Sequence, residues 1–177
     1  MFTTTYYLDG DGTADSARLV EFVSLGGYGS STVTTLFHYT YANGYVSTVV
    51  IYGETTQGDS LEDVVHFAVS NGNFTAVTDS AQNANFVLTY NNMTTTTAAL
   101  PPDPILGAFT PFGGGSGTGT NVLGKNNTNL LASYPIVAGT VGSFTYTLDS
   151  RNRISTRTET FTSPTPIPAN TTYFTYY

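Results

Sequence analysis

The chain lacks cysteine and tryptophan altogether, and only 10% of its 177 residues are charged. The absence of cysteine excludes disulfides, thiol catalysis and thiolate metal sites. No run approaches the roughly 18 apolar residues that a membrane-spanning helix needs. Five basic residues stand against twelve acidic ones, giving a net charge of −7. Because phosphate binding needs clustered lysine and arginine, this balance predicts that nucleic acid is not a partner.

Residues that favour strands and turns dominate the composition. Aromatic residues make up 14% of the sequence, and there are 18 glycines. Threonine, tyrosine, phenylalanine and valine favour strands, whereas glycine and asparagine favour turns. Strong helix formers such as lysine and methionine are scarce. We therefore predict a single all-β domain over residues 1–177, with little helix.

Several segments have the sequence of a β-hairpin. An Asn-Gly pair between two aromatic or β-branched runs favours a type I′ turn, which needs positive φ at both central residues. Such pairs occur at residues 43–44 and 71–72, and the sequence Asp-Ser-Arg-Asn at residues 149–152 occupies a similar position. The predicted hairpins are residues 2–24, 36–52, 64–78 and 143–162, and further strands are predicted at 85–92 and 171–177.

Some predicted strands are apolar on both faces. Between residues 45 and 52, strict alternation puts Val46 and Val50 on one face and Val49 and Ile51 on the other. A sheet with one buried face does not need this pattern, whereas a sheet that wraps around its own contents does. We predict an antiparallel meander that forms a strongly curved sheet or an open or closed β-barrel.

Residues 98–121 break the strand pattern with four prolines and a glycine-rich run. A loop of this length is uncommon in a compact domain unless it has a function. Its apolar residues, Phe109 among them, suit a segment that packs back over the concave face of the sheet. A crossover between two halves of the sheet is the alternative.

The stretch LDGDGTAD near the N-terminus is the candidate metal site. In the register of an EF-hand loop, Asp9, Asp11 and Asp15 fall at ligand positions 3, 5 and 9. Tyr7 and Arg18 fall where the first and last ligands belong, so both end ligands are missing. We favour a hairpin turn in which the aspartates accept hydrogen bonds from backbone amides, and a calcium site is the alternative.

Two enzyme-like motifs lack the context that their chemistry needs. GDSL at residues 58–61, followed by Asp63 and His66, resembles two esterase motifs, yet here they abut in a chain without alternating helices. The near P-loop GTNVLGKN has Asn126 where the metal-binding hydroxyl belongs. We therefore predict no catalytic residue, no enzyme activity, and no cofactor besides the calcium ion considered above, and a hydrolase is the remote alternative.

A threonine-rich run raises a further idea, an ice-binding surface. Residues 156–160 read Thr-Arg-Thr-Glu-Thr. Ice binding needs a flat and regular ladder of threonines, and the interleaved charges argue against it.

Aromatic side chains on the curved sheet are the candidate ligand contacts. Tyrosine combines a flat ring with a polar tip, which suits both sugars and apolar chains. We expect an aromatic-lined groove that binds a small hydrophobic molecule or a glycan, and the alternative is that these rings form the core. The candidates are Tyr39, Tyr41, Tyr45, Phe109, Tyr146 and Tyr173.

The order of the motifs resembles a known family. YYLDGDG, HYTYANGYVSTV and FTYTLDSRNRIST are similar to the YTYD-x-x-GR rhythm of secreted bacterial surface proteins. Aromatic hairpins come first, then a proline- and glycine-rich middle, then LGKNNTNLLASY, and finally TTYFTYY. This order resembles an uncharacterised lipoprotein family of Bacteroidetes, described as a domain of unknown function with a porin-like fold.

The resemblance implies a barrel-like antiparallel sheet on an exported protein that a lipid anchors to the outer membrane, at the cell surface or in the periplasm. It implies that the lipidated cysteine belongs to a removed leader ahead of Met1, so that membrane association depends on the anchor alone. The family supplies no catalytic residues.

Overall fold

The computed structural model describes residues 2–24, 30–93, 127–135, 140–164 and 166–175, together with Leu123 and Lys125. These residues form strands and turns without any helix, which confirms the all-β prediction. In this part of the chain, accordingly, no helix has the length and apolar character to cross a membrane. The predicted loop at residues 98–121, including Phe109, lies outside the described residues.

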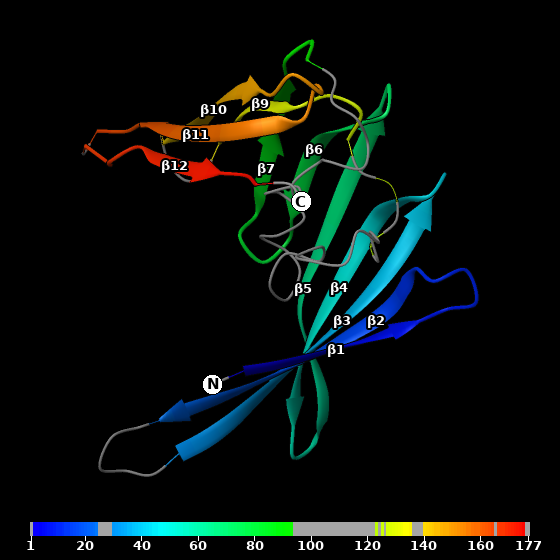
Figure 1. The fold of residues 1–177 in the computed structure, drawn as a ribbon. Coiled ribbons are helices and arrows are strands. Elements are labelled where there is room, and N and C mark those ends of the chain that lie inside the picture. The colour runs from blue at the N-terminus through cyan, green and yellow to red at the C-terminus, as the bar shows by residue number, and fades with distance from the viewer. Residues whose placement is uncertain are drawn as a thin grey trace. The chain divides into compact units, whose positions relative to one another are not determined.

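The strands form two sheets in which neighbours in space are also neighbours in sequence (Figure 1). The first sheet contains, in order, β1 (Phe2–Leu8), β2 (Ala14–Ser24), β3 (Ser30–Ala42), β4 (Tyr45–Thr55), β5 (Gly58–Ser70), β6 (Asn73–Asp79) and β7 (Ala84–Val87). The second contains β8 (Thr89–Tyr90), β9 (Leu131–Pro135), β10 (Val141–Leu148), β11 (Ile154–Thr162) and β12 (Asn170–Tyr173). The pairs from β1 to β5 and from β8 to β12 are antiparallel, as predicted.

Both sheets are open within the described residues. The edge strands are β1 and β7 in the first sheet, and β8 and β12 in the second. The closed barrel therefore stays a prediction.

Contacts divide the chain into two compact units. The first comprises Met1–Phe67, Thr78–Ala84 and Pro102–Lys125, and the second comprises Ala68–Val77, Asn85–Pro101 and Asn126–Tyr177. The division between the units falls within two strands: within β5 between Phe67 and Ala68, and within β6 between Val77 and Thr78. That the chain is a single domain stays a prediction.

The Asn-Gly turns have the predicted geometry. Asn43 and Gly44 have φ of +56° and +82°, and Asn71 and Gly72 have φ of +52° and +77°. Positive φ at both central residues is the mark of a type I′ turn, whose twist matches that of the strands it joins. Residues 43–44 therefore join β3 to β4, and residues 71–72 join β5 to β6.

β-bulges shift the register in several strand pairs. They occur between β1 and β2, β3 and β4, β4 and β5, β8 and β9, and β10 and β11. A bulge leaves one residue unpaired and increases the local twist of the sheet. In β3–β4 the shift between Thr40 and Tyr41 leaves Ser47 unpaired, so that Val46 joins Val49 on the buried face. The predicted placement of these two valines on opposite faces is therefore wrong.

Each unit has its own apolar core. Fully or almost fully buried side chains of the first unit include Ala14, Ala17, Phe37, Tyr39, Val46, Val49, Val65, Phe67 and Leu123. Those of the second unit include Phe74, Val77, Leu88, Leu130, Leu131, Phe144 and Ile154.

A tyrosine covers a glycine in the second sheet. Gly142 of β10 pairs directly with Tyr134 of β9, and the tyrosine ring occupies the space that a Cβ at position 142 would need. The same ring stacks on Phe144 with 5.5 Å between centroids, and its hydroxyl donates to a Glu159 carboxylate oxygen at 2.6 Å. Burial, followed by hydrogen bonding to Glu159, raises the pKa of Tyr134. The small residue at position 142 thus allows Tyr134 to lie flat across the sheet.

We expect Gly142→Ala to lower the free energy of unfolding by about 1–3 kcal/mol, because the new methyl group must displace the Tyr134 ring. Chemical denaturation measures the change. Gly10→Ala is the matched control, since a Cβ at position 10 meets no atom within 4 Å. Equal stability of the two variants would contradict this account of Gly142.

Candidate functional site

The turn between β1 and β2 is held together by its own aspartates. The Asp9 amide donates to the Thr13 carbonyl at 2.9 Å, and the Gly12 amide donates to the Asp9 carbonyl at 3.1 Å. The Asp9 carboxylate accepts from the Asp11 amide at 3.2 Å. The Asp11 carboxylate accepts from the Thr13 amide at 2.9 Å and from its hydroxyl at 2.6 Å. These contacts are those of a hairpin turn with internal carboxylate acceptors.

The same contacts bear on the calcium alternative. Hydrogen bonding with Asp9, and then with the hydroxyl and amide of Thr13, lowers the pKa of Asp11 to about 2. Asp15 is the unpaired residue of the bulge in β2 and is exposed. In the described part of the chain, no group of three or more His, Cys, Asp or Glu side chains could hold a metal ion. Calcium binding by these aspartates stays a prediction.

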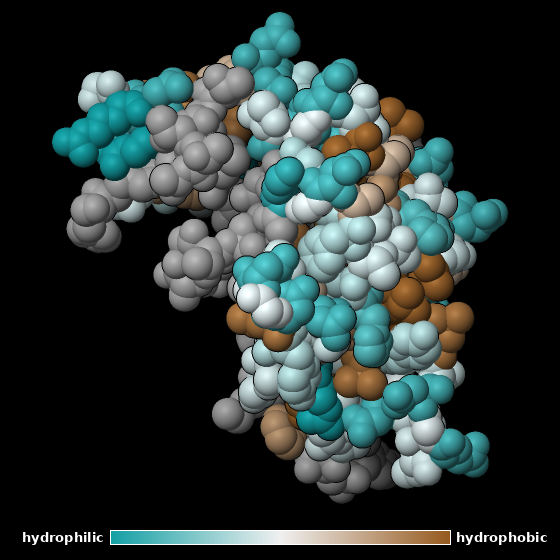
Figure 2. Space-filling view, turned by 90° about the vertical axis from the view of Figure 1, so that its right-hand side faces the viewer, coloured by the Kyte–Doolittle hydropathy of each residue, from teal (hydrophilic) through white to brown (hydrophobic). Residues whose placement is uncertain are grey.

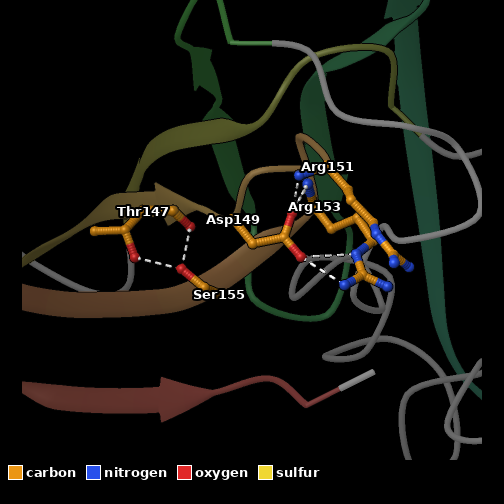
Figure 3. Close-up of polar contacts among 5 residues, drawn as sticks. All are labelled: Thr147, Asp149, Arg151, Arg153 and Ser155. Carbon is orange, nitrogen blue, oxygen red and sulfur yellow. Dashed lines mark hydrogen bonds and ion pairs between the residues drawn. The ribbon is translucent and has the colours of Figure 1, made fainter. Parts of the chain in front are cut away.

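The turn between β10 and β11 repeats this design (Figure 3). The Asp149 amide donates to the Arg153 carbonyl at 2.8 Å, and the Asn152 amide donates to the Asp149 carbonyl at 3.0 Å. Asp149 Oδ1 accepts from the amides of Arg151 and Arg153, both at 2.9 Å. Asn152 takes φ of +60°, at the position where Gly12 has +85°. The two hairpins, which belong to different units, thus share the same pattern of hydrogen bonds in their turns.

An ion pair distinguishes the second turn. Arg153 donates to Asp149 Oδ2 through Nε at 2.8 Å and through its terminal nitrogen at 2.6 Å. Hydrogen bonding to the Arg153 side chain and then to its amide lowers the pKa of Asp149. Arg151 and Arg153 therefore both contact the turn aspartate, Arg151 through its backbone amide and Arg153 through its backbone amide and its side chain.

Two predicted ligand residues, Tyr39 and Tyr41, lie on the buried face of the first sheet. Tyr39 is 5% exposed, and its hydroxyl has no hydrogen-bond partner among the described residues. Tyr41 is half-buried and donates to the Ala14 carbonyl at 2.6 Å. Burial is the main cause that raises the pKa of both tyrosines. Electrostatic interaction with Tyr6 and Tyr41 raises the pKa of Tyr39 further. Electrostatic interaction with Asp9, Asp11 and Asp15 does the same for Tyr41. Both phenols therefore stay protonated donors at physiological pH.

Tyr45 lies on the face opposite Tyr41, because its partner in the register is Ala42. Lys125 Nζ lies 5.6 Å from the centre of the Tyr45 ring and donates to the Asn43 carbonyl at 2.9 Å. The Lys125 amide donates to the Gly44 carbonyl at 2.7 Å. The lysine of the near P-loop therefore caps the turn between β3 and β4.

The remaining predicted aromatics lie in the second unit or outside the described residues. Tyr146 is half-buried, and its hydroxyl donates to the Leu131 carbonyl at 2.9 Å. Tyr173 on β12 is 77% exposed. Phe109 lies outside the described residues. The structure thus brings Tyr39 and Tyr41 together on one face and separates Tyr45 from them, and ligand contact by any of these residues stays a prediction.

Serine and threonine hydroxyls cover most of one face of the second sheet, which also carries Val141. The register places Ser143 opposite Ser133 and Thr160, and places Thr145 opposite Thr158. We call this the hydroxyl face, and it comprises Thr89, Ser133, Ser143, Thr145, Thr147, Thr156, Thr158, Thr160, Thr162 and Thr171, most of them exposed.

Hydrogen bonds join hydroxyls of this face across the strands. The oxygens of Thr147 and Thr156 lie 2.6 Å apart, those of Thr89 and Ser133 lie 2.7 Å apart, and those of Thr158 and Thr171 lie 3.1 Å apart. Thr147 also hydrogen bonds to Ser155 at 2.8 Å (Figure 3). Each hydroxyl is both a donor and an acceptor, so the paired groups keep further hydrogen-bonding capacity on this face.

The hydroxyl face carries no charged side chain among its described residues. Arg157 and Glu159 alternate with its threonines along β11 and therefore lie on the opposite face of the sheet. There the Arg157 guanidinium lies 5.5 Å from the centre of the Phe144 ring. The charges of the Thr-Arg-Thr-Glu-Thr run thus do not interrupt the row of threonines. Strand alternation is the signal in the sequence that could have revealed this face.

Tyr173 stands at the edge of the hydroxyl face. It pairs with Thr156 in the register, so that its ring lies on the same side of the sheet as the threonines. With 77% of its surface exposed, it is the most exposed of the large apolar side chains described. An exposed aromatic ring thus lies beside a neutral hydroxyl surface.

Comparison with solved structures finds a protein of similar fold. The structure is similar to the crystal structure of a porin-like protein from Bacteroides uniformis ATCC 8492, with a TM-score of 0.62 and 16% sequence identity. The match covers 96% of this chain and 66% of the other, so this chain spans about two thirds of that protein. No protein-family model and no curated sequence matches the chain. The antiparallel all-β architecture is therefore similar to that of this porin-like protein.

Asp149 should make the stability of the second unit depend on pH. Because its pKa is lowered in the fold, it contributes stability above the unfolded value of about 3.9, and this is lost as pH falls through the folded value. We expect Asp149→Asn to lower the melting temperature at pH 7 and to lower it less below about pH 4. Asp59→Asn, which removes an exposed carboxylate from β5, is the control. A pH-independent effect of Asp149→Asn would contradict the ion pair with Arg153.

The two tyrosines of the buried face should respond oppositely to loss of the hydroxyl. Tyr39→Phe removes a buried hydroxyl that has no partner among the described residues, and we expect it to raise the free energy of unfolding by about 1 kcal/mol. Tyr41→Phe breaks the bond to the Ala14 carbonyl, and we expect a loss of about 1 kcal/mol. Urea denaturation of both variants measures the difference, and a destabilised Tyr39→Phe would show that its hydroxyl has a partner.

Proposed function

We propose that the chain is a non-enzymatic module of an exported, lipid-anchored protein and that it binds a neutral glycan. The observation that carries the proposal is the exposed Tyr173 ring beside the hydroxyl face. Sugars present apolar C–H faces and hydroxyl edges. A tyrosine ring packs against the first, and serine and threonine hydroxyls, each both donor and acceptor, pair with the second.

The neutrality of the hydroxyl face supports an uncharged ligand. An anionic polymer is bound through lysine and arginine. The nearest cation in the sequence, Arg157, lies on the other side of the sheet against Phe144. A neutral polysaccharide needs no counter-charge, and an extended chain can follow the rows of threonines across β10, β11 and β12.

The porin-like neighbour from Bacteroides supports the proposed location. Porin-like folds are typical of exported proteins of the outer envelope. The motif order that resembles a Bacteroidetes lipoprotein family agrees with this, and lipid anchoring would hold the glycan-binding face at the outer membrane.

The test is native affinity electrophoresis in gels that contain a soluble β-glucan, a mannan, a galactan or polygalacturonate. We expect at least one neutral polysaccharide to retard the protein, and Tyr173→Ala to weaken that binding about tenfold, because a stacking ring contributes about 1.4 kcal/mol. Thr145→Val with Thr160→Val should also weaken it, since valine keeps the shape and removes the hydroxyl.

Tyr7→Ala is the matched control, because Tyr7 is also an exposed tyrosine, 52% accessible, but belongs to the first unit. It should bind like the parent protein. Retardation by polygalacturonate alone, no retardation by any neutral polysaccharide, or unchanged binding by Tyr173→Ala would refute the proposal.

A further inference from the structure

The hydroxyl face is ordered in rows that cross the strands. Tyr173 of β12 lies opposite Thr156 of β11, which lies opposite Thr147 of β10, and we call these three residues the first row. The amide of Phe174 donates to the Ser155 carbonyl at 3.0 Å, which holds the end of β12, and with it Tyr173, against β11. The second row, one step further along the strands, comprises Thr171, Thr158 and Thr145.

The spacing within a row differs from the spacing between rows. Neighbouring strands lie about 4.8 Å apart, so the side chains of one row repeat at about that distance. Along a strand, the next side chain on the same face is two residues away, which is about 6.8 Å. One pyranose of a fully extended glycan is about as long as the shorter of these distances. A glycan that follows a row therefore places one sugar over each strand, whereas one that follows a strand falls out of step.

The hydrogen bonds at the end of the first row determine what it presents to a ligand (Figure 3). The Ser155 hydroxyl donates to the Thr147 carbonyl at 3.1 Å. Because a hydroxyl has one proton, the 2.8 Å contact between the Ser155 and Thr147 hydroxyls must take the proton of Thr147. By the same count, the 2.6 Å contact between Thr147 and Thr156 takes the proton of Thr156. The lone pairs that remain on these oxygens can only accept, so the ligand must donate.

This requirement distinguishes a sugar from a hydrophobic cargo. Sugar hydroxyls donate hydrogen bonds, whereas acyl chains do not. Among the described residues on the face of the molecule shown in Figure 2, hydrophobic side chains form separate brown areas divided by hydrophilic ones. A hydrophobic cargo needs a contiguous apolar patch, which these separate areas do not provide.

We propose that the ligand is an extended, β-1,4-linked neutral glycan that crosses the second sheet along the first row, with one sugar over each of β12, β11 and β10. The proposal rests on the proposed function, because it names the class of glycan that the same face binds. The Tyr173 ring, 77% exposed, packs against the first sugar. Hydroxyls along one edge of the glycan donate to Thr156 and Thr147, and its other edge faces the second row.

Tetrasaccharides that differ only in linkage provide the direct test. Cellotetraose is β-1,4-linked and extended, whereas α-1,4-linked maltotetraose and β-1,3-linked laminaritetraose coil, so their hydroxyls do not follow a straight row. In isothermal titration calorimetry, we expect cellotetraose or the β-1,4-linked mannotetraose to bind at least about tenfold more tightly than either coiled chain. Affinity should also rise from the β-1,4-linked disaccharide to the trisaccharide, because the first row crosses three strands.

Variants of Thr156 test the acceptor role of the first row. Thr156→Val keeps the shape and removes the hydroxyl, and we expect it to weaken binding of the tetrasaccharide about tenfold. Thr156→Ser keeps the hydroxyl and should retain binding. Thr32→Val, at an exposed position of β3 in the first unit, is the matched control and should bind like the parent protein. Thermal melts check that each variant folds.

The outcomes separate this inference from the proposed function. Failure of both β-1,4-linked tetrasaccharides to bind, equal binding of the three glucose tetrasaccharides, or unchanged binding by Thr156→Val would overturn it. If a coiled tetrasaccharide binds best and Tyr173→Ala weakens that binding, glycan binding stands and the β-1,4-linked class is wrong. If no neutral polysaccharide retards the protein either, the proposed function fails as well.

Discussion

The fold depends on how its turns satisfy their backbone groups. Asp9 and Asp149 each accept a backbone amide from two residues further along the chain, and each turn then needs positive φ three residues after the aspartate. Gly12 and Asn152 supply that conformation. A bulge lies just after each turn, at Asp15 in β2 and at Ser155 in β11, and it sets which side chains of the rest of that strand face the core. In these two hairpins, the register of the strands therefore follows from a few local hydrogen bonds.

Short-range signals in the sequence predict much of this architecture. The Asn-Gly turns at residues 43–44 and 71–72 are specified by two adjacent residues, because few other residues tolerate positive φ. The strands around them follow from aromatic and β-branched content. The all-β class and the meander order could thus be predicted without any knowledge of long-range contacts.

Features that depend on register could not be predicted in the same way. Strict alternation fails at Val46, because the unpaired Ser47 changes the face on which it lies. Tyr45 turns away from Tyr41 for a different reason, because the two-residue turn pairs it with Ala42, which lies on the other face of β3. Alternation does hold along β11, where it separates the threonines from Arg157 and Glu159. An isolated sequence pattern does not reveal which of these cases applies.

The hydroxyl face has a consequence for the surroundings in which such a protein can work. Serine and threonine hydroxyls do not change charge across the pH range of living environments, and their hydrogen bonds are not screened by salt as ion pairs are. A surface built from them keeps the same donors and acceptors in acidic or neutral, dilute or saline fluid. Contacts made through this side of the sheet would thus change little with pH or with salt concentration.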